Sequence, residues 1–263
     1  MERNKQILIF FSIVIIIVLV YSMGNLLAQS SSDNGNNNST SVNNTTSITK
    51  VLIYNGDGVM DSSVDGIEDC LNDSNNQNIS RNNKFQYSTT GVINSNTLSG
   101  YDVLIMPGGE FSYYIDSDDI DSQAIKQFVQ GGKGYIGICA GAYIASDYIN
   151  GYYSGWGLAP DVTTYTENYE GLLQISSTDF GNKVLNSSLT NIHMQNGPAM
   201  STNDSQIIMA KFADNNTGYQ NYAAIIGDTY GSGRVILSGP HPEVSPENPQ
   251  LLTNMVLWVT KKI

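Results

Sequence analysis

The sequence contains few of the side chains that bind metals or form disulfides. Among its 263 residues there are two Cys and two His, and only 14% of the residues are charged. With so few of them, we exclude both a multi-ligand zinc site and a disulfide framework. We therefore expect no metal and no cofactor.

Basic residues are also scarce. Lys and Arg together number 12 against 24 Asp and Glu, which gives a net charge of −12, and no Lys or Arg cluster occurs anywhere. A folded domain this acidic repels the phosphate backbone of nucleic acids, so the composition excludes nucleic acid as a partner.

Apolar residues are, by contrast, plentiful enough for a packed core. They make up 40% of the chain, and aromatic residues make up 10%, with 16 Tyr among them. This composition excludes a disordered chain, and the length suits one large domain or two small ones.

The N-terminus carries an uncharged apolar segment. Positions 6–32 hold no charged residue, and Ile7–Val20 is almost entirely Ile, Val, Leu and Phe. Arg3 and Lys5 precede it, and no base follows until Lys50. The positive-inside rule then predicts a cytoplasmic N-terminus and an exported body.

Two forms of export stay open. Ala28-Gln29-Ser30 offers small residues for a signal peptidase, whereas an uncleaved segment extended toward the roughly 20 residues of a spanning helix would anchor the body to the membrane. We thus expect a signal peptide or membrane anchor at 1–28. A disordered Ser, Asn and Thr-rich linker at 29–49 and a folded domain at 50–263 would follow.

From Lys50 onward, short apolar runs alternate with helical patterns. Such alternation predicts an α/β domain whose mostly parallel sheet has helices on both faces. We expect helices around Val64 to Leu71, between a cap at Asp121 and Gly131, after Cys139, and at 251–259. The expected strands are 51–54, 85–90, 103–106, 135–138, 172–176, 207–212, 223–226 and 235–238.

Gly137-Ile138-Cys139-Ala140-Gly141 joins one of these strands to the next helix. A nucleophile on such a turn needs small neighbours, and its sulfur would lie at a helix N-terminus that favours thiolate. Two other readings stay open: Cys139 is a buried structural residue, or it pairs with Cys70, since export permits disulfides.

A nucleophilic Cys needs a base that a third group orients. His241 and Glu243 follow a strand directly, in Gly239-Pro240-His241-Pro242-Glu243, and an extended segment points both to the same side. His193 has no carboxylate at that offset and is interpreted as a wall or core residue. The Ala140 N–H and a glycine N–H of Pro107-Gly108-Gly109 would serve as donors to an oxyanion.

These motifs resemble class I glutamine amidotransferase-like domains, which have a flavodoxin-like fold. Tyr54-Asn55-Gly56, Pro107-Gly108-Gly109-Glu110, the run 131–143 and Gly197-Pro198 are more similar still to the N-terminal domain of eukaryotic biotin–protein ligases. The biotin ligase catalytic domain itself is not recognisable, so ligation of biotin is not implied.

The resemblance implies that Cys139 is the nucleophile, His241 the general base and Glu243 its partner, with Gly109 and Ala140 as oxyanion donors. Gly108 and Glu110 become candidates for substrate binding. Glu110 either contacts a substrate amine or is a solvent-facing loop acid.

The expected function is hydrolysis of an amide or γ-glutamyl-type bond in a small or peptide-like substrate, through a thioester. Amidotransfer would need an ATP-dependent synthetase, which we do not expect outside the membrane, and no such partner is identifiable. The alternative is a non-catalytic surface binding domain that retains the fold.

Overall fold

The computed structural model describes residues 46–186 and 189–263. The expected N-terminal segment at 1–28 and most of the expected linker lie outside the described residues. Within the described ranges, no helix is long and apolar enough to cross a membrane.

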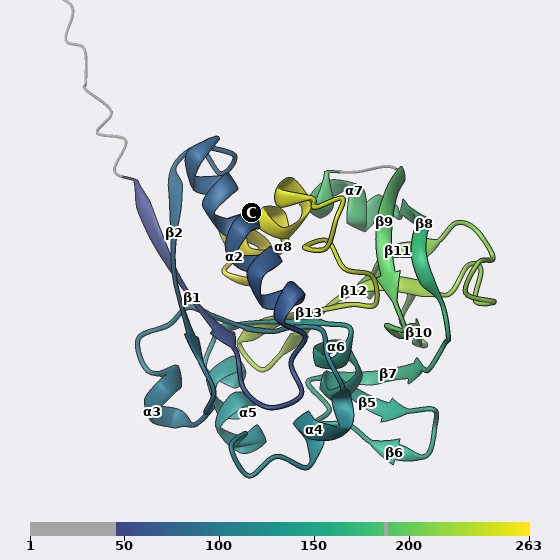
Figure 1. Ribbon diagram of the computed structural model, residues 1–263, viewed down its shortest axis with the longest axis horizontal. Coiled ribbons are helices and arrows are strands. Elements are labelled where there is room, and N and C mark those ends of the chain that lie inside the picture. The colour runs from purple at the N-terminus through teal and green to yellow at the C-terminus, as the bar shows by residue number, and fades with distance from the viewer. Residues whose placement is uncertain (1–45, 187–188) are drawn as a thin grey trace, which may run out of the picture. The chain divides into compact units, whose positions relative to one another are not determined.

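The centre of the fold is a parallel sheet in the order β2-β1-β3-β4-β13 (Figure 1). Its inner strands β1, β3, β4 and β13 are rich in Val, Ile and Leu, as expected for strands that are buried on both faces, whereas the edge strand β2 is mostly polar. They span Ser47–Tyr54 (β1), Asn83–Thr90 (β2), Val103–Met106 (β3), Gly134–Ile138 (β4) and Gly233–Ser238 (β13).

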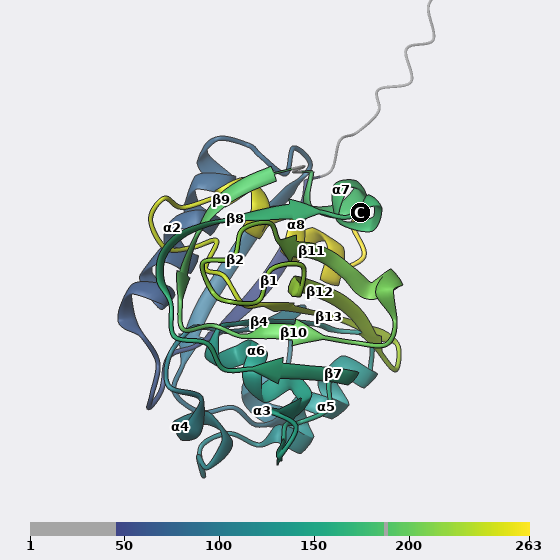
Figure 2. The ribbon, with the colours of Figure 1, turned by 90° about the vertical axis from the view of Figure 1, so that its right-hand side faces the viewer.

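Helices cover both faces of this sheet, and Figure 2 shows the two groups on its opposite sides. One face carries Asp61–Asn76 (α2) and Pro249–Val259 (α8), and Asp179–Leu185 (α7) packs beside α8. The other carries Ser95–Leu98 (α3), Phe111–Ile115 (α4), Ser122–Gln130 (α5) and Ala140–Ala145 (α6). The Asp121 side chain caps α5, as the sequence predicts.

Strand residues alternate between two hydrophobic cores. Val51 and Ile53 pack on the α2 and α8 side, whereas Leu52 and Tyr54 pack on the α5 side. Side chains on a strand alternate in direction, so one apolar run supplies both cores. The α/β fold class with helices on both faces is therefore confirmed.

Beyond β13 the sheet continues in antiparallel strands. The sequence predicts three of them, at 172–176, 207–212 and 223–226, but neither the shorter strands between them nor their antiparallel pairing. The strands of this extension are Ser146–Ile149 (β5), Tyr153–Ser154 (β6), Ala159–Tyr165 (β7), Glu170–Ser177 (β8), Leu189–Gln195 (β9), Ala199–Ser201 (β10), Ile208–Phe212 (β11) and Ala223–Tyr230 (β12). Within it only β5 and β7 pair in parallel. The extension provides one wall of the candidate site.

The first strand begins at Ser47, although the sequence analysis placed the start of the domain at residue 50. Thr49 is fully buried, and its hydroxyl donates a hydrogen bond of 2.9 Å to Oδ1 of Asn83. The polar residues at the end of the expected linker therefore take part in the sheet, because β2 supplies partners for them.

Candidate active site

The site lies where three neighbouring parallel strands end. Cys139 follows β4, the Pro107-Gly108-Gly109 loop follows β3, and His241 comes after β13. The register pairs the ends of these strands, Met106 with Gly137 and Ser238 with Ile138. In open α/β sheets the crevice at the carboxyl ends of the strands is the usual place for a ligand.

Cys139 occupies the sharp turn that the sequence predicts. Its backbone is strained, with φ 50° and ψ −106°, and it directly precedes helix α6. A Cβ at Gly137 would lie 2.3 Å from the Gly141 carbonyl oxygen, and one at Gly141 would lie 2.2 Å from that of Met106. Both glycines are thus required by close backbone contacts, and together they fix the position of the sulfur.

His241 and Glu243 form a buried pair. Nδ1 of His241 lies 2.8 Å from Oε1 of Glu243, and both side chains are almost inaccessible to solvent. Burial alone lowers the pKa of His241, but the Glu243 carboxylate and the neighbouring Cys139 side chain outweigh it and raise that pKa to about 10. Nε2 of His241 has no hydrogen-bond partner among the described residues.

Ser63 connects this pair to the β3 loop. Its hydroxyl donates to Oε1 of Glu243 at 2.6 Å and accepts the Gly108 N–H at 2.9 Å. Ser63 lies in the first turn of α2 and is fully buried. Glu243 Oε1 therefore has two partners, the imidazole and a hydroxyl that also holds the loop after β3.

The loop after β3 also packs against the imidazole. A Cβ at Gly108 would lie 2.5 Å from Cε1 of His241. Gly108 is buried and is not among the residues that line the described cavity. The structure thus places this predicted substrate-binding residue behind His241, where its N–H holds Ser63.

Two backbone N–H groups near Cys139 are free of protein acceptors in the described part of the chain. They belong to Gly109 and Ala140, the residues predicted to bind an oxyanion. Tyr114 steadies the loop, because its hydroxyl lies 3.3 Å from the carbonyl oxygens of Pro107 and Gly108. This geometry suits stabilisation of a negatively charged oxygen.

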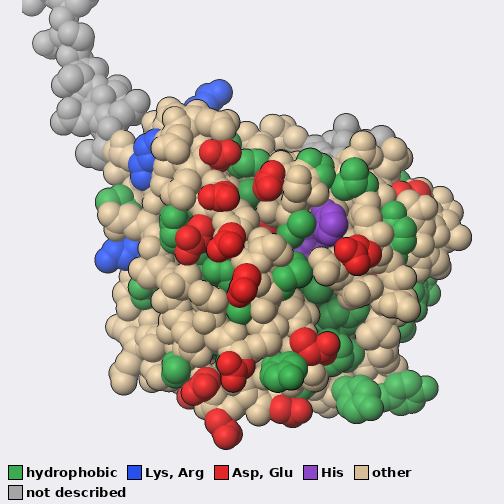
Figure 3. All heavy atoms as spheres, in the orientation of Figure 1, with side chains coloured by type: hydrophobic (Ala, Val, Ile, Leu, Met, Phe, Trp, Pro, Cys, Tyr) green, Lys and Arg blue, Asp and Glu red, His purple; other side chains and the backbone are tan. Residues whose placement is uncertain are grey.

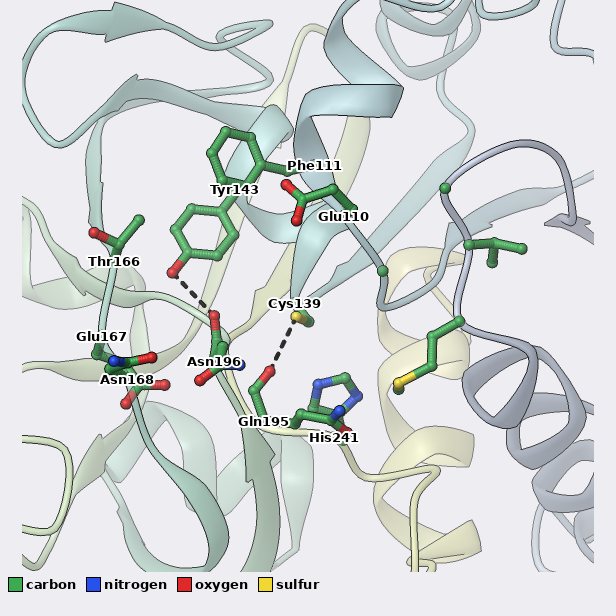
Figure 4. A pocket seen from close by; sticks show the side chains of 14 residues that line it. Glu110, Phe111, Cys139, Tyr143, Thr166, Glu167, Asn168, Gln195, Asn196 and His241 are labelled. Atoms are coloured by element: carbon green, nitrogen blue, oxygen red, sulfur yellow. Dashed lines mark hydrogen bonds between the residues drawn. The ribbon is translucent and has the colours of Figure 1, made fainter.

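A cavity of about 490 Å³ opens beside these groups (Figure 4). Cys139, His241 and Glu110 lie toward one side of it, and the loop between β7 and β8 lies opposite. Glu110 is exposed and caps α4, and its carboxylate accepts the Ser112 hydroxyl at 3.1 Å. The lining residues are Gly58, Val59, Met60, Gly109, Glu110, Phe111, Cys139, Tyr143, Thr166, Glu167, Asn168, Gln195, Asn196 and His241.

The sequence analysis did not identify two polar residues of the site, Ser63 and Glu167. Glu167 lies between β7 and β8, and both its carboxylate oxygens are buried without a hydrogen-bond partner among the described residues. Burial raises its pKa to about 7, against a smaller lowering effect of the Tyr169 backbone. No motif marks either residue, since each reaches the site only through the tertiary fold.

The other cysteine and the other histidine of the chain are Cys70 and His193, and both lie near the candidate site. Cys70 and Cys139 are both free thiols, so the disulfide between them does not form in this structure. Burial, and then the Glu243 charge, raises the pKa of Cys70 to about 12. His193 is half-buried on β9 and does not line the cavity, but its backbone carbonyl accepts the His241 N–H at 2.8 Å and so holds the base in place.

Part of the chain resembles a known protein family. Residues 49–155 match the family model described as biotin-protein ligase, N terminal. The resemblance to that family is confirmed. The matched region includes Gly109 and Cys139, whereas His241 and Glu243 lie beyond it.

One curated relative is the biotin–protein ligase of Schizosaccharomyces pombe. It is 26% identical over 170 residues, which are 57% of this chain and 27% of that protein. The chain thus spans about a quarter of the length of the curated relative it matches.

Solved structures share the fold at low identity. PurLQS from Thermotoga maritima is 16% identical with a TM-score of 0.58, over 80% of this chain and 97% of that one. A β-galactosidase from Rahnella sp. R3 is 15% identical with a TM-score of 0.54, over 81% of this chain and 31% of that one. At such identities the likeness concerns the fold alone.

Replacing Ser63 by Ala is expected to lower the free energy of unfolding by about 1–3 kcal/mol, because the buried Gly108 N–H loses its acceptor and Glu243 a donor. Urea unfolding measures this. The matched control is Ser74→Ala in the same helix, where the buried hydroxyl has no partner among the described residues, and it is expected to cost much less. Equal losses in both variants would contradict the role of Ser63.

Glu167 makes the stability depend on pH with a definite sign. Its folded pKa of about 7 exceeds the unfolded value of about 4.3, so its contribution is full below about pH 4.3 and is lost as pH rises to about 7. As the pH rises from about 4.3 to about 7, the free energy of unfolding of Glu167→Gln is therefore expected to fall less than that of the wild type. Asn168→Gln, which changes no titratable group, should keep the wild-type slope. A Glu167→Gln slope equal to that of the wild type would refute the buried, unpaired carboxylate.

Proposed function

We propose that this protein is a cysteine-nucleophile hydrolase that cleaves an amide or γ-glutamyl-type bond through a thioester. The main support for the proposal is that Cys139 and His241 line the same cavity, and that His241 is paired with the buried Glu243. A nucleophile, a base and a group that orients the base are the three parts that covalent acyl transfer requires.

The raised pKa of His241 places the thiol proton of Cys139 on Nε2 of His241 before the reaction begins. In the first step the Cys139 thiolate attacks the amide carbonyl carbon. The carbonyl oxygen becomes an oxyanion beside the Gly109 and Ala140 N–H groups. When the C–N bond breaks, His241 returns the proton to the leaving nitrogen, so that an amine or ammonia departs and a thioester remains.

In the second step water attacks the thioester, and His241 removes its proton. The second oxyanion collapses with loss of the Cys139 thiolate, a carboxylic acid is released, and the thiolate again lies beside the protonated His241. Glu243 holds the imidazole by Nδ1 throughout and stabilises its charged form, which agrees with the raised pKa of His241.

Water is the proposed acceptor because we also propose that the body is exported. This part of the proposal rests on the uncharged positions 6–32 and on the two bases before them. A reporter enzyme active only outside the cytoplasm, fused after residue 263, tests it. Reporter activity supports export, and an inactive but intact fusion overturns it.

The catalytic proposal is tested by alkylation with iodoacetamide at about pH 7 and by mass spectrometry of both thiols. Cys139 is expected to react at least about tenfold faster than Cys70, whose raised pKa keeps it protonated. His241→Ala should slow the reaction of Cys139 and leave Cys70 unchanged. Cys139 that reacts no faster than Cys70 would favour the non-catalytic binding domain.

Turnover is measured on glutamine, γ-glutamyl peptides and simple amides. Cys139→Ser is expected to lower it at least about 10³-fold, and His241→Ala about 10²-fold or more. Cys70→Ser is the matched control for loss of a thiol and should retain activity. Wild-type activity in Cys139→Ser would refute the mechanism.

A further inference from the structure

One residue that lines the cavity carries a carboxylate without an ion-pair partner among the described residues. This residue is Glu167, and neither carboxylate oxygen has a hydrogen-bond partner among the described residues. Burying a carboxylate without a partner is costly, so natural structures usually pair it, protonate it or present it to a ligand. The proposed reaction gives Glu167 no part in the bond-breaking steps.

The protein does not supply a cation for this carboxylate. No Lys or Arg of the described residues lines the cavity, and the only ion pairs found in 46–186 and 189–263 are Lys133 with Asp102 and His241 with Glu243. Figure 3 shows acidic side chains around the histidine, with Lys and Arg side chains at one edge of that face. Glu167 is therefore either protonated or, when it is ionised, without a counter-charge from the described residues.

The surroundings of Glu167 suit an ammonium group. Thr166, Asn168 and Asn196 line the same part of the cavity and offer neutral oxygen acceptors, and Figure 4 shows them beside Glu167. A primary ammonium has three donors and no acceptor, so one carboxylate with neutral oxygens around it satisfies the group. A substrate carboxylate would find two acids here, Glu110 and Glu167, and no cation.

We propose that Glu167 binds the ammonium group of the substrate, so that, of the two bond types in the proposed function, the enzyme prefers amides with a free primary amine to γ-glutamyl substrates, which also carry a carboxylate. The inference rests on the proposed function and names its substrate class. Glu167 lies across the cavity from Cys139, with Tyr143 between the two walls (Figure 4), so the amine binds away from the bond that breaks.

The test uses chloroacetamide probes of equal length that end in an ammonium, a hydroxyl or a carboxylate group. Second-order rates of Cys139 alkylation are measured at about pH 8, where Glu167 is ionised. The wild type is expected to react about 10- to 100-fold faster with the ammonium probe than with the hydroxyl probe, and slowest with the carboxylate probe. Glu167→Gln should lose the ammonium preference and keep the rate with the hydroxyl probe.

The matched control is Glu170→Gln, which removes an exposed acid three positions along the chain that does not line the cavity. It should keep the ammonium preference. Equal rates for the three probes in the wild type, or the same slowing of all three in Glu167→Gln, would overturn the inference.

A second measurement does not depend on the reactivity of Cys139. Calorimetry on Cys139→Ser compares β-alaninamide, which has a free amine, with its N-acetyl form. Binding of the amine alone, and its loss in the double variant with Glu167→Gln, would support the inference. Equal binding of the two compounds would contradict the inference. Absence of amide turnover in the wild type would instead refute the proposed function, so the two failures are distinguishable.

Discussion

The site depends on one oxygen atom, Oε1 of Glu243. This oxygen is buried, lies 2.8 Å from Nδ1 of His241 and accepts a hydrogen bond of 2.6 Å from the Ser63 hydroxyl. Because Ser63 also accepts the Gly108 N–H, helix α2, the loop after β3 and the loop after β13 are tied together at this point. A buried carboxylate with two donors is fixed more rigidly than one with a single partner.

The parallel sheet explains why these loops meet. Strands β3, β4 and β13 are neighbours with their carboxyl ends level, so the loop, the nucleophile and the base come to one edge from distant parts of the sequence. The close contacts at Gly108, Gly137 and Gly141 leave the loops little room to move. Precision in the placement of the sulfur and the imidazole therefore comes from backbone packing.

The parallel half of the fold could be predicted because its strands are continuous apolar runs between clear turn residues. Val103–Met106, for example, matches the expected strand, and the Asp121 cap lies where the sequence placed it. Short strands such as Tyr153–Ser154 and Ala199–Ser201 could not be predicted, because two or three residues carry no periodicity. Their pairing is decided by tertiary contacts.

The same distinction applies to the site. Cys139, His241 and Glu243 could be named because local spacing constrains them, through the flanking glycines and prolines. Ser63 could not be named because its partners, Glu243 and the Gly108 N–H, are brought to it only by folding. Glu167 could not be named because its burial without a hydrogen-bond partner among the described residues is also a result of folding. Gly108 had a recognisable motif, but its position behind His241 depends on the packing of two loops.

The antiparallel extension has a consequence for how this protein could diversify. The reacting groups come from loops of the parallel half, whereas Thr166, Glu167 and Asn168 come from a connection in the extension. Substitutions in that connection can alter which molecules are accepted without moving the strained turn at Cys139. In the proposed enzyme, recognition and chemistry would come from different parts of the sheet, so a charge reversal at Glu167 would change the ligand preference and leave the catalytic residues in place.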